Sequence, residues 1–135
     1  MNSSAPSSWT INATPSFRKD IKRLSRDLYK SERQRQEFAD FLLSLYDNLA
    51  AEGLPSRKVD ADPMQGGLAP AGKQLFKIYL QPPHTRGQSG QMRILALVSR
   101  EERRVELIMA YTHAEYPKQP SPREIKDRLK EAGQG

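Results

Sequence analysis

Apolar residues recur along this chain in blocks, and the first block has the spacing of an amphipathic helix. Pro15 suits the first turn of a helix, and Thr14 suits the N-cap position before it. The apolar residues that follow at intervals of three and four are Phe17, Ile21, Leu24 and Leu28. We therefore expect a helix that begins at Pro15 and buries this face.

A second helical block follows, with its apolar face rotated by about 70° from the first on an ideal helix. Its members are Phe38, Phe41, Leu42, Leu45 and Leu49. Ser31 and Gln34 have the spacing of a capping box, which favours a new helix there. No glycine or proline enforces a break between Lys30 and Arg33, so one long bent helix remains an alternative to two helices. Gly53 is expected to end this second block.

The second half of the chain favours strands. Residues 75–80 alternate apolar and polar side chains, and residues 92–98 and 104–111 form two further apolar runs joined by a short charged turn. Residues 8–14 also alternate and are expected to form a short fourth strand. Residues 54–72 have no sustained period, so we interpret them as a long connection or functional loop.

These elements predict one α+β domain over residues 8–132. A helical hairpin or long bent helix would pack on a small antiparallel sheet of three or four strands. A short helix over residues 123–132, opened by Pro122 and stopped by Gly133, would close the domain. We expect residues 1–7 to be disordered and residues 133–135 to form a tail.

Composition excludes several classes of site. Among 135 residues there is no cysteine and there are two histidines. Disulfides, thiolate catalysis and the common zinc modules are therefore excluded, and we expect neither a metal nor a cofactor. No apolar run is long enough to span a bilayer, and residues 1–8 lack the features of a secretory signal. We expect a cytoplasmic protein without a membrane partner.

Positive charge is concentrated in one segment. The formal net charge is +6, and between Phe17 and Gln36 eight basic residues stand against three acidic ones. The basic residues are Arg18, Lys19, Lys22, Arg23, Arg26, Lys30, Arg33 and Arg35. Such a face fits contact with a polyanion such as RNA, but it equally fits a solvated helix surface.

Candidate chemistry lies at two strand ends. Arg93 stands at the start of the run 92–98, just after a glycine-bearing polar turn, and the run 104–111 ends next to His113. The short turn between the two runs predicts a hairpin, whose open ends would bring Arg93 and His113 to the same edge of the sheet. An arginine can bridge two phosphate oxygens, and a histidine can transfer a proton near neutral pH.

The order of elements, together with residues 76–80, 88–95, 105–111 and 121–125, resembles the RelE/ParE superfamily of toxins from type II toxin-antitoxin systems. The HigB-type branch is the most similar. Ser89, Gly90 and Arg93 match that branch's Lys-Ser-Gly-Gly-Tyr-Arg pattern, although its second glycine and its tyrosine are replaced. At the end of the last strand Tyr111 matches the family's Tyr-Ala-Lys-Asn-Glu, whereas His113 replaces its lysine.

The resemblance implies a RelE-like fold and a ribosome-associated endoribonuclease that cleaves messenger RNA without a metal and is neutralised by a cognate antitoxin. It implies that Arg93 stabilises charge on the phosphate, that His113 transfers a proton, and that Tyr111 bonds the phosphate or stacks on a base. The residues expected to hold the substrate are Lys77, Arg86 and Ser89. Two alternatives stay open: a ParE-like toxin that binds gyrase and cleaves nothing, and a non-catalytic basic module that binds RNA or DNA.

Overall fold

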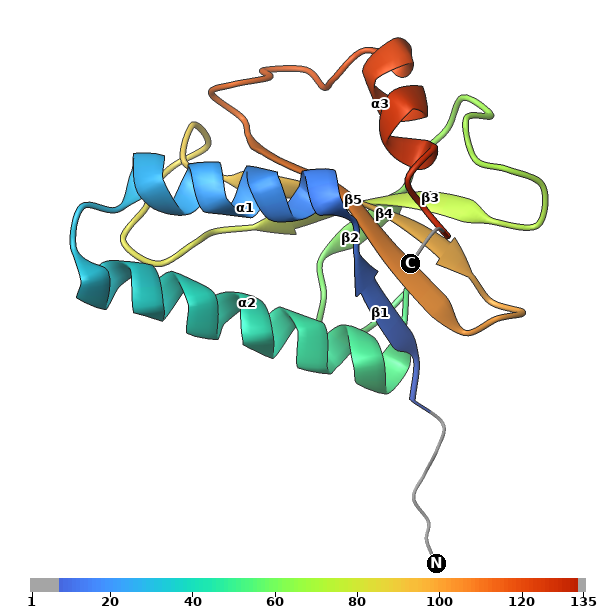
Figure 1. Cartoon of the computed structure of the whole chain (residues 1–135), viewed down its shortest axis with the longest axis horizontal. Coiled ribbons are helices and arrows are strands. Elements are labelled where there is room, and N and C mark those ends of the chain that lie inside the picture. The colour runs from blue at the N-terminus through green and yellow to red at the C-terminus, as the bar shows by residue number, and fades with distance from the viewer. Residues whose placement is uncertain (1–7, 134–135) are drawn as a thin grey trace, which may run out of the picture.

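The computed structural model describes residues 8–133, and within them it has three helices and one sheet (Figure 1). The disorder expected for residues 1–7 concerns residues outside the described part of the chain, as do the last two residues of the expected tail. The elements in chain order are β1 (Thr10–Ala13), α1 (Pro15–Leu28), α2 (Glu32–Glu52), β2 (Ala61–Pro63), β3 (Gln74–Leu80), β4 (Met92–Ser99), β5 (Arg104–Thr112) and α3 (Pro122–Leu129).

The N-terminal helical region consists of two helices. The expected caps are present: the Thr14 side chain accepts a hydrogen bond from the backbone of Phe17, and the Ser31 side chain accepts one from Gln34. Between the helices Tyr29 has an extended backbone, with φ of −129° and ψ of 137°. The Tyr29 side chain is buried, and its hydroxyl donates to the carbonyl oxygen of Pro83 at 2.7 Å. Burial of this ring separates α1 from α2, so the region is two helices and not one long bent helix.

The sheet has five strands in the order β1-β5-β4-β3-β2. The neighbours β2, β3, β4 and β5 pair antiparallel, as expected, whereas β1 runs parallel to β5. The additional strand is β2, which lies inside the segment that we interpreted as a connection. Its three residues, Ala61–Pro63, are too few to show an alternating pattern. The α+β expectation is confirmed, with five strands instead of three or four.

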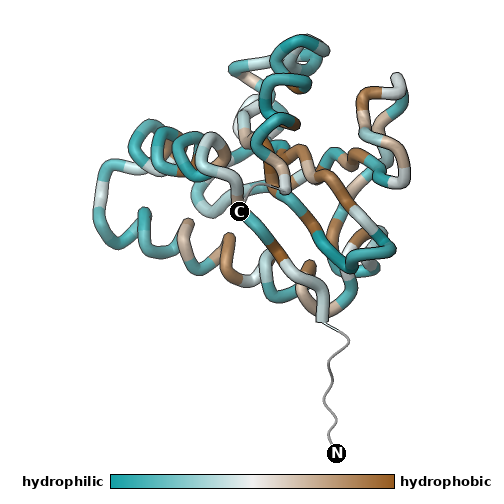
Figure 2. The backbone as a smooth tube through the Cα atoms, turned by 45° about the vertical axis from the view of Figure 1, so that its right-hand side comes forward, coloured by the Kyte–Doolittle hydropathy of each residue, from teal (hydrophilic) through white to brown (hydrophobic). Residues whose placement is uncertain are grey.

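Each face of the sheet carries its own core. The main core lies between the sheet and the pair α1 and α2, with Phe17, Phe38 and Ile94 among its fully buried members. A smaller core on the opposite face is covered by α3 and by residues 64–69, and it includes Leu95 and Ile125. Figure 2 shows hydrophobic colour along the strands and mostly hydrophilic colour on α3. On this second face the β4 and β5 side chains Leu95, Leu97 and Met109 are also buried.

A β-bulge divides β5 into two halves. Leu95 of β4 pairs with Met109, but the next residue, Ala96, pairs with Leu107, so Ile108 is the extra residue. Val105 and Leu107 belong to the helix-covered core, whereas Met109 and Tyr111 belong to the core on the opposite face. Strict alternation would have put Val105 and Tyr111 on one face. The bulge therefore turns the end of β5 toward the side where Arg93 lies.

Side chains complete the hydrogen bonding of β5 where β1 stops. β1 pairs with β5 only as far as Leu107. Beyond it the backbone N–H of Ala110 donates to the carboxylate of Asp20 at 3.0 Å, and the carbonyl of Ile108 accepts from Arg128 at 2.8 Å. Asp20 is 4% exposed and also accepts from both terminal nitrogens of Arg128, at 2.8 and 3.0 Å. Asp20 of α1 and Arg128 of α3 thereby hold both helices against the same edge of β5.

The same lock extends to the turn after β5. Arg23 of α1 donates to Asp20 at 3.0 Å and to both carboxylate oxygens of Glu115 at 3.2 Å. Glu115 in turn accepts a hydrogen bond from the backbone N–H of Thr112 at 3.0 Å. This bond closes the turn that carries His113.

Candidate anion site at the open end of the sheet

Three side chains form a row at the open end of the sheet, which is the end where β3 and β5 stop and β4 begins. Tyr79 of β3 pairs with Arg93 of β4, and Arg93 pairs with Tyr111 of β5. Directly paired residues point to the same face of a sheet, and Tyr111 identifies this face as the one opposite α1 and α2. Lys77, two residues before Tyr79, shares that face because side chains alternate along a strand.

Arg93 is the centre of this row. The side chain is buried, with 8% of the residue exposed. One terminal nitrogen lies 2.7 Å from Nδ1 of His113, the other donates to Oε1 of Gln91 at 2.9 Å, and the guanidinium carbon lies 5.6 Å from the centre of the Tyr79 ring. The backbone N–H of His113 also donates to the carbonyl of Gln91 at 2.9 Å, which fixes the turn against β4. The prediction that Arg93 and His113 lie at the same edge of the sheet is confirmed by this contact.

The short contact defines the state of the imidazole. A guanidinium is always protonated and can only donate, so Nδ1 of His113 must be the acceptor. A ring that accepts at Nδ1 carries its hydrogen on Nε2 and is neutral. His113 therefore orients Arg93 in this arrangement without compensating its charge.

All partners of Arg93 in the described residues are neutral: an imidazole, an amide and an aromatic face. No carboxylate forms an ion pair with it in that part of the chain. A buried cation without an anion is costly, because neutral partners offset the loss of water less well than an opposite charge does. The arrangement is one that a phosphate or another anion would complete.

Lys77 adds a second cation beside Arg93. Its ammonium group donates to Oε1 of Gln119 at 2.8 Å, another neutral partner. Burial and the charge of Arg93 lower the pKa of Lys77, and Asp62 opposes the shift. Lys77, Tyr79, Gln119 and Asp62 line a hollow of about 290 Å³. Asp62 lies on the adjacent strand β2, where it pairs with Lys77.

Tyr111 is the buried end of the row. It is fully buried, its ring packs edge-to-face against Tyr116 at 5.3 Å between centres, and its hydroxyl has no hydrogen-bond partner in the described residues. Burial raises the pKa of Tyr111 to about 12, although the charge of Arg93 opposes the shift. The hydroxyl therefore stays protonated at neutral pH. For Tyr79, burial followed by the charge of Asp62 raises the pKa.

Not every expected residue joins the cluster. Arg86 and Ser89 are exposed in the loop between β3 and β4, and within the described residues no hydrogen bond or ion pair links them to Arg93, His113 or Lys77. Sequence reasoning missed Gln91, which we regarded only as a departure from the family pattern. Its position two residues before Arg93, on the same face, was the available signal.

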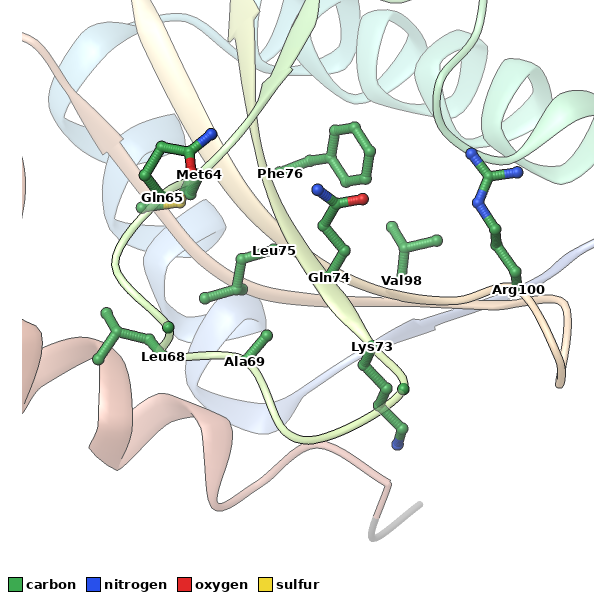
Figure 3. A pocket seen from close by; sticks show the side chains of 12 residues that line it. Met64, Gln65, Leu68, Ala69, Lys73, Gln74, Leu75, Phe76, Val98 and Arg100 are labelled. Carbon is green, nitrogen blue, oxygen red and sulfur yellow. The ribbon is translucent and has the colours of Figure 1, made fainter.

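A larger hollow lies elsewhere in the described residues. It measures about 450 Å³ and is lined by parts of the loop before β3 and by Gln74, Val98 and Arg100 (Figure 3). Gln74 pairs with Val98 at the end of β3 and β4 that is remote from the pair Tyr79 and Arg93. We place the candidate site at the Arg93 end, because the uncompensated charge lies there.

The described residues lack two further kinds of feature. They contain no group of three or more His, Cys, Asp or Glu side chains that could hold a metal ion. None of the helices among them is both long and apolar enough to cross a membrane.

Two solved structures are similar to this chain over most of its length. A chain of the archaeal RelE-RelB complex from Pyrococcus horikoshii superposes with a TM-score of 0.50 at 13% identity, covering 78% of this chain and 94% of its own. The metal-bound toxin from Helicobacter pylori superposes with a TM-score of 0.52 at 20% identity, covering 80% and 98%. This chain has the RelE fold. At these identities the likeness concerns the fold alone.

The RelE fold expected from the sequence motifs is therefore confirmed. No protein-family model matches the sequence, and no curated protein does so either. The two RelE-fold neighbours are covered almost end to end, whereas about a fifth of this chain extends beyond each of them. These comparisons therefore assign no activity to this chain.

Proposed function

We propose that this protein is the toxin of a toxin-antitoxin system and acts in the cytoplasm as a metal-independent endoribonuclease on ribosome-bound messenger RNA. The observation that carries the proposal is the buried guanidinium of Arg93, whose partners are all neutral. Such a group binds a phosphate more strongly than an arginine already paired with a carboxylate. The RelE-fold neighbours, a toxin and a chain of a RelE-RelB complex, support the toxin class and an antitoxin partner.

The contact between Arg93 and His113 suggests how substrate would activate the site. A phosphate that binds Arg93 replaces Nδ1 of His113 as the acceptor and frees the lone pair of that nitrogen. The freed imidazole can then take the proton of the ribose 2′-hydroxyl, whose oxygen attacks the adjacent phosphorus. Binding of substrate and generation of the base are thereby one event.

The remaining steps need positive charge and a proton. Arg93 stabilises the additional negative charge on the phosphate oxygens as the bond to the 5′-oxygen breaks. Lys77 supplies a second positive charge, and its lowered pKa makes it a better proton donor to the departing 5′-oxygen than an ordinary lysine. Tyr111 is fully buried next to Arg93 in the strand pairing, so it would position Arg93 and not contact RNA, whereas Arg86 and Ser89 would hold the RNA from the exposed loop.

Ribosome-programmed cleavage tests the proposal. We expect purified protein to cut messenger RNA in a reconstituted translation mixture, and Arg93→Met and His113→Gln each to slow single-turnover cleavage by about 100-fold or more. Arg100→Met is the matched control, because Arg100 is an exposed arginine just after β4. Circular dichroism verifies that all three variants are folded.

The two alternative functions predict different results. A ParE-like toxin that binds gyrase would arrest growth without cutting messenger RNA, and Arg93→Met would leave the arrest unchanged. A non-catalytic RNA- or DNA-binding module would bind nucleic acid with no cleavage at all. Either result overturns the nuclease proposal.

A further inference from the structure

The hollow next to the Arg93 cluster contains the kinds of group that recognise a nucleobase. It measures about 290 Å³ and is lined by Asp62, Lys77, Tyr79 and Gln119 together with residues 63–65. Asp62 and Lys77 are directly paired across β2 and β3, so both side chains lie on the face that carries Arg93. The volume is at the lower end of the range for ligand pockets in proteins, which suits a single aromatic base.

Tyr79 provides an aromatic surface between this hollow and Arg93. Its ring is partly exposed and lines the hollow, and the guanidinium carbon of Arg93 lies 5.6 Å from the ring centre. Proteins recognise single-stranded RNA by stacking unpaired bases on such rings. An RNA strand whose phosphate binds Arg93 therefore finds a stacking surface next to that phosphate.

Asp62 supplies a group that only accepts hydrogen bonds. It is exposed on the edge strand β2, and in the part of the chain that the structure describes no lysine or arginine forms an ion pair with it. Burial raises the pKa of Tyr79, and the charge of Asp62 and a hydrogen bond to its carboxylate raise it further. A carboxylate offers about four acceptor positions, so one bond to Tyr79 leaves capacity for two donors of a ligand.

Gln119 supplies a donor whose orientation is defined by Lys77. The ammonium group of Lys77 lies 2.8 Å from the side chain of Gln119 and can only donate, so the contacting atom must be the amide oxygen. The NH₂ group of Gln119 has no acceptor among the described residues and stays free to donate. The hollow thus combines a carboxylate acceptor with an amide donor.

We infer that this hollow binds a guanine base. The Watson–Crick edge of guanine presents two adjacent donors, N1–H and the 2-amino group, followed by the acceptor O6. Asp62 can accept from both donors, and Gln119 can donate to O6. Adenine and cytosine offer one donor group beside an acceptor that a carboxylate repels, and uracil has its N–H between two acceptors. In the proposed toxin the guanine belongs to the messenger RNA bound at Arg93, an identification that rests on the function proposed above.

Uncleavable trinucleotides that differ in one base test this inference. The probes are fluorescent 2′-O-methyl trinucleotides with guanine, hypoxanthine or adenine between two uridines, and hypoxanthine lacks only the 2-amino group of guanine. We expect the guanine probe to bind about tenfold or more tightly than the adenine probe, with the hypoxanthine probe between them. Asp62→Asn replaces one acceptor oxygen by a donor and should reduce the guanine preference to less than about twofold.

A matched control uses the neighbouring carboxylate. Asp60→Asn makes the same change two residues earlier, at an exposed position that does not line the hollow, and should keep the guanine preference. Equal binding of the guanine and adenine probes by the wild type, or an unchanged preference in Asp62→Asn, would overturn the inference.

Two further measurements distinguish this inference from the nuclease proposal and from a site for free nucleotides. Arg93→Met should weaken the binding of all three probes to a similar degree and retain the guanine preference, because phosphate contacts carry no sequence information. A guanine preference in a protein that cleaves nothing would therefore overturn only the nuclease proposal. Guanosine triphosphate should displace the guanine probe less effectively than the unlabelled trinucleotide does. More effective displacement would assign the hollow to a free nucleotide and overturn the identification with messenger RNA.

Discussion

Two of the charged clusters at the sheet differ in what balances the charge of their arginine side chains. At the edge of β5, Arg23 and Arg128 share the buried carboxylate of Asp20, with distances of 2.8 to 3.0 Å. At the end of β4, Arg93 is also buried but has only His113, Gln91 and the Tyr79 ring as partners. The first cluster is complete, whereas the second lacks an anion. We infer that the first maintains the fold and the second binds substrate.

The comparison predicts its largest effect at Asp20. Asp20→Asn should lower the free energy of unfolding by about 3 kcal/mol, because it leaves two arginines and the N–H of Ala110 with an incomplete partner. Urea unfolding followed by circular dichroism measures this. A loss below about 1 kcal/mol would show that the Asp20 cluster is no structural lock.

The opposite sign is expected at Arg93. Arg93→Met removes an uncompensated buried charge and keeps an unbranched apolar chain, so the free energy of unfolding should stay unchanged or rise by up to about 1 kcal/mol. Activity should be lost in the same variant. If Arg93→Met instead destabilised the protein as much as Asp20→Asn, the distinction between the two clusters would be wrong.

A smaller effect is expected at Tyr111, whose buried hydroxyl lacks a partner in the described residues. Tyr111→Phe should raise the free energy of unfolding by about 1 kcal/mol at pH 7. The pKa of Tyr111 is raised from 10.0 to about 12, so above pH 10 the unfolded state loses this proton first and the free energy of unfolding falls further as the pH rises toward 12, whereas below pH 10 it is unaffected. Wild-type protein should therefore lose more stability than Tyr111→Phe between pH 10 and 12.

Unfolding curves at pH 7, 10 and 12 separate the two parts of that prediction. Tyr29 and Tyr46 also have a pKa raised to about 12 by burial, so the variant should retain part of the alkaline loss. An identical pH dependence in both proteins would argue against burial as the cause of the Tyr111 shift.

Much of this fold was predictable, because local rules decided it. The caps at Thr14 and Ser31 followed from their side-chain hydroxyls, and the stop at Gly53 from the positive φ that glycine adopts without strain. The break at Tyr29 did not, since it depends on burial of that ring and on a hydrogen bond to Pro83, more than fifty residues away. A strand as short as β2 likewise has no period to detect.

The site was predictable only in part. The hairpin rule brought Arg93 and His113 together, and their contact is 2.7 Å. The bulge at Ile108, which turns the end of β5 toward Arg93, has no sequence signature. Nor does the sequence reveal that Arg93 is buried without a carboxylate partner. That depends on the distances of all acidic side chains from Arg93 in the folded chain.

Calorimetric titration with an uncleavable RNA tests the central claim most directly. A short 2′-O-methyl oligonucleotide offers the phosphates but no attacking hydroxyl, so binding is measured apart from cleavage. We predict that Arg93→Met weakens binding at least tenfold, which corresponds to the loss of one charge-assisted contact of about 1.5 kcal/mol or more, whereas Arg100→Met leaves it unchanged. Equal affinity of the wild type and Arg93→Met for this RNA would contradict the account.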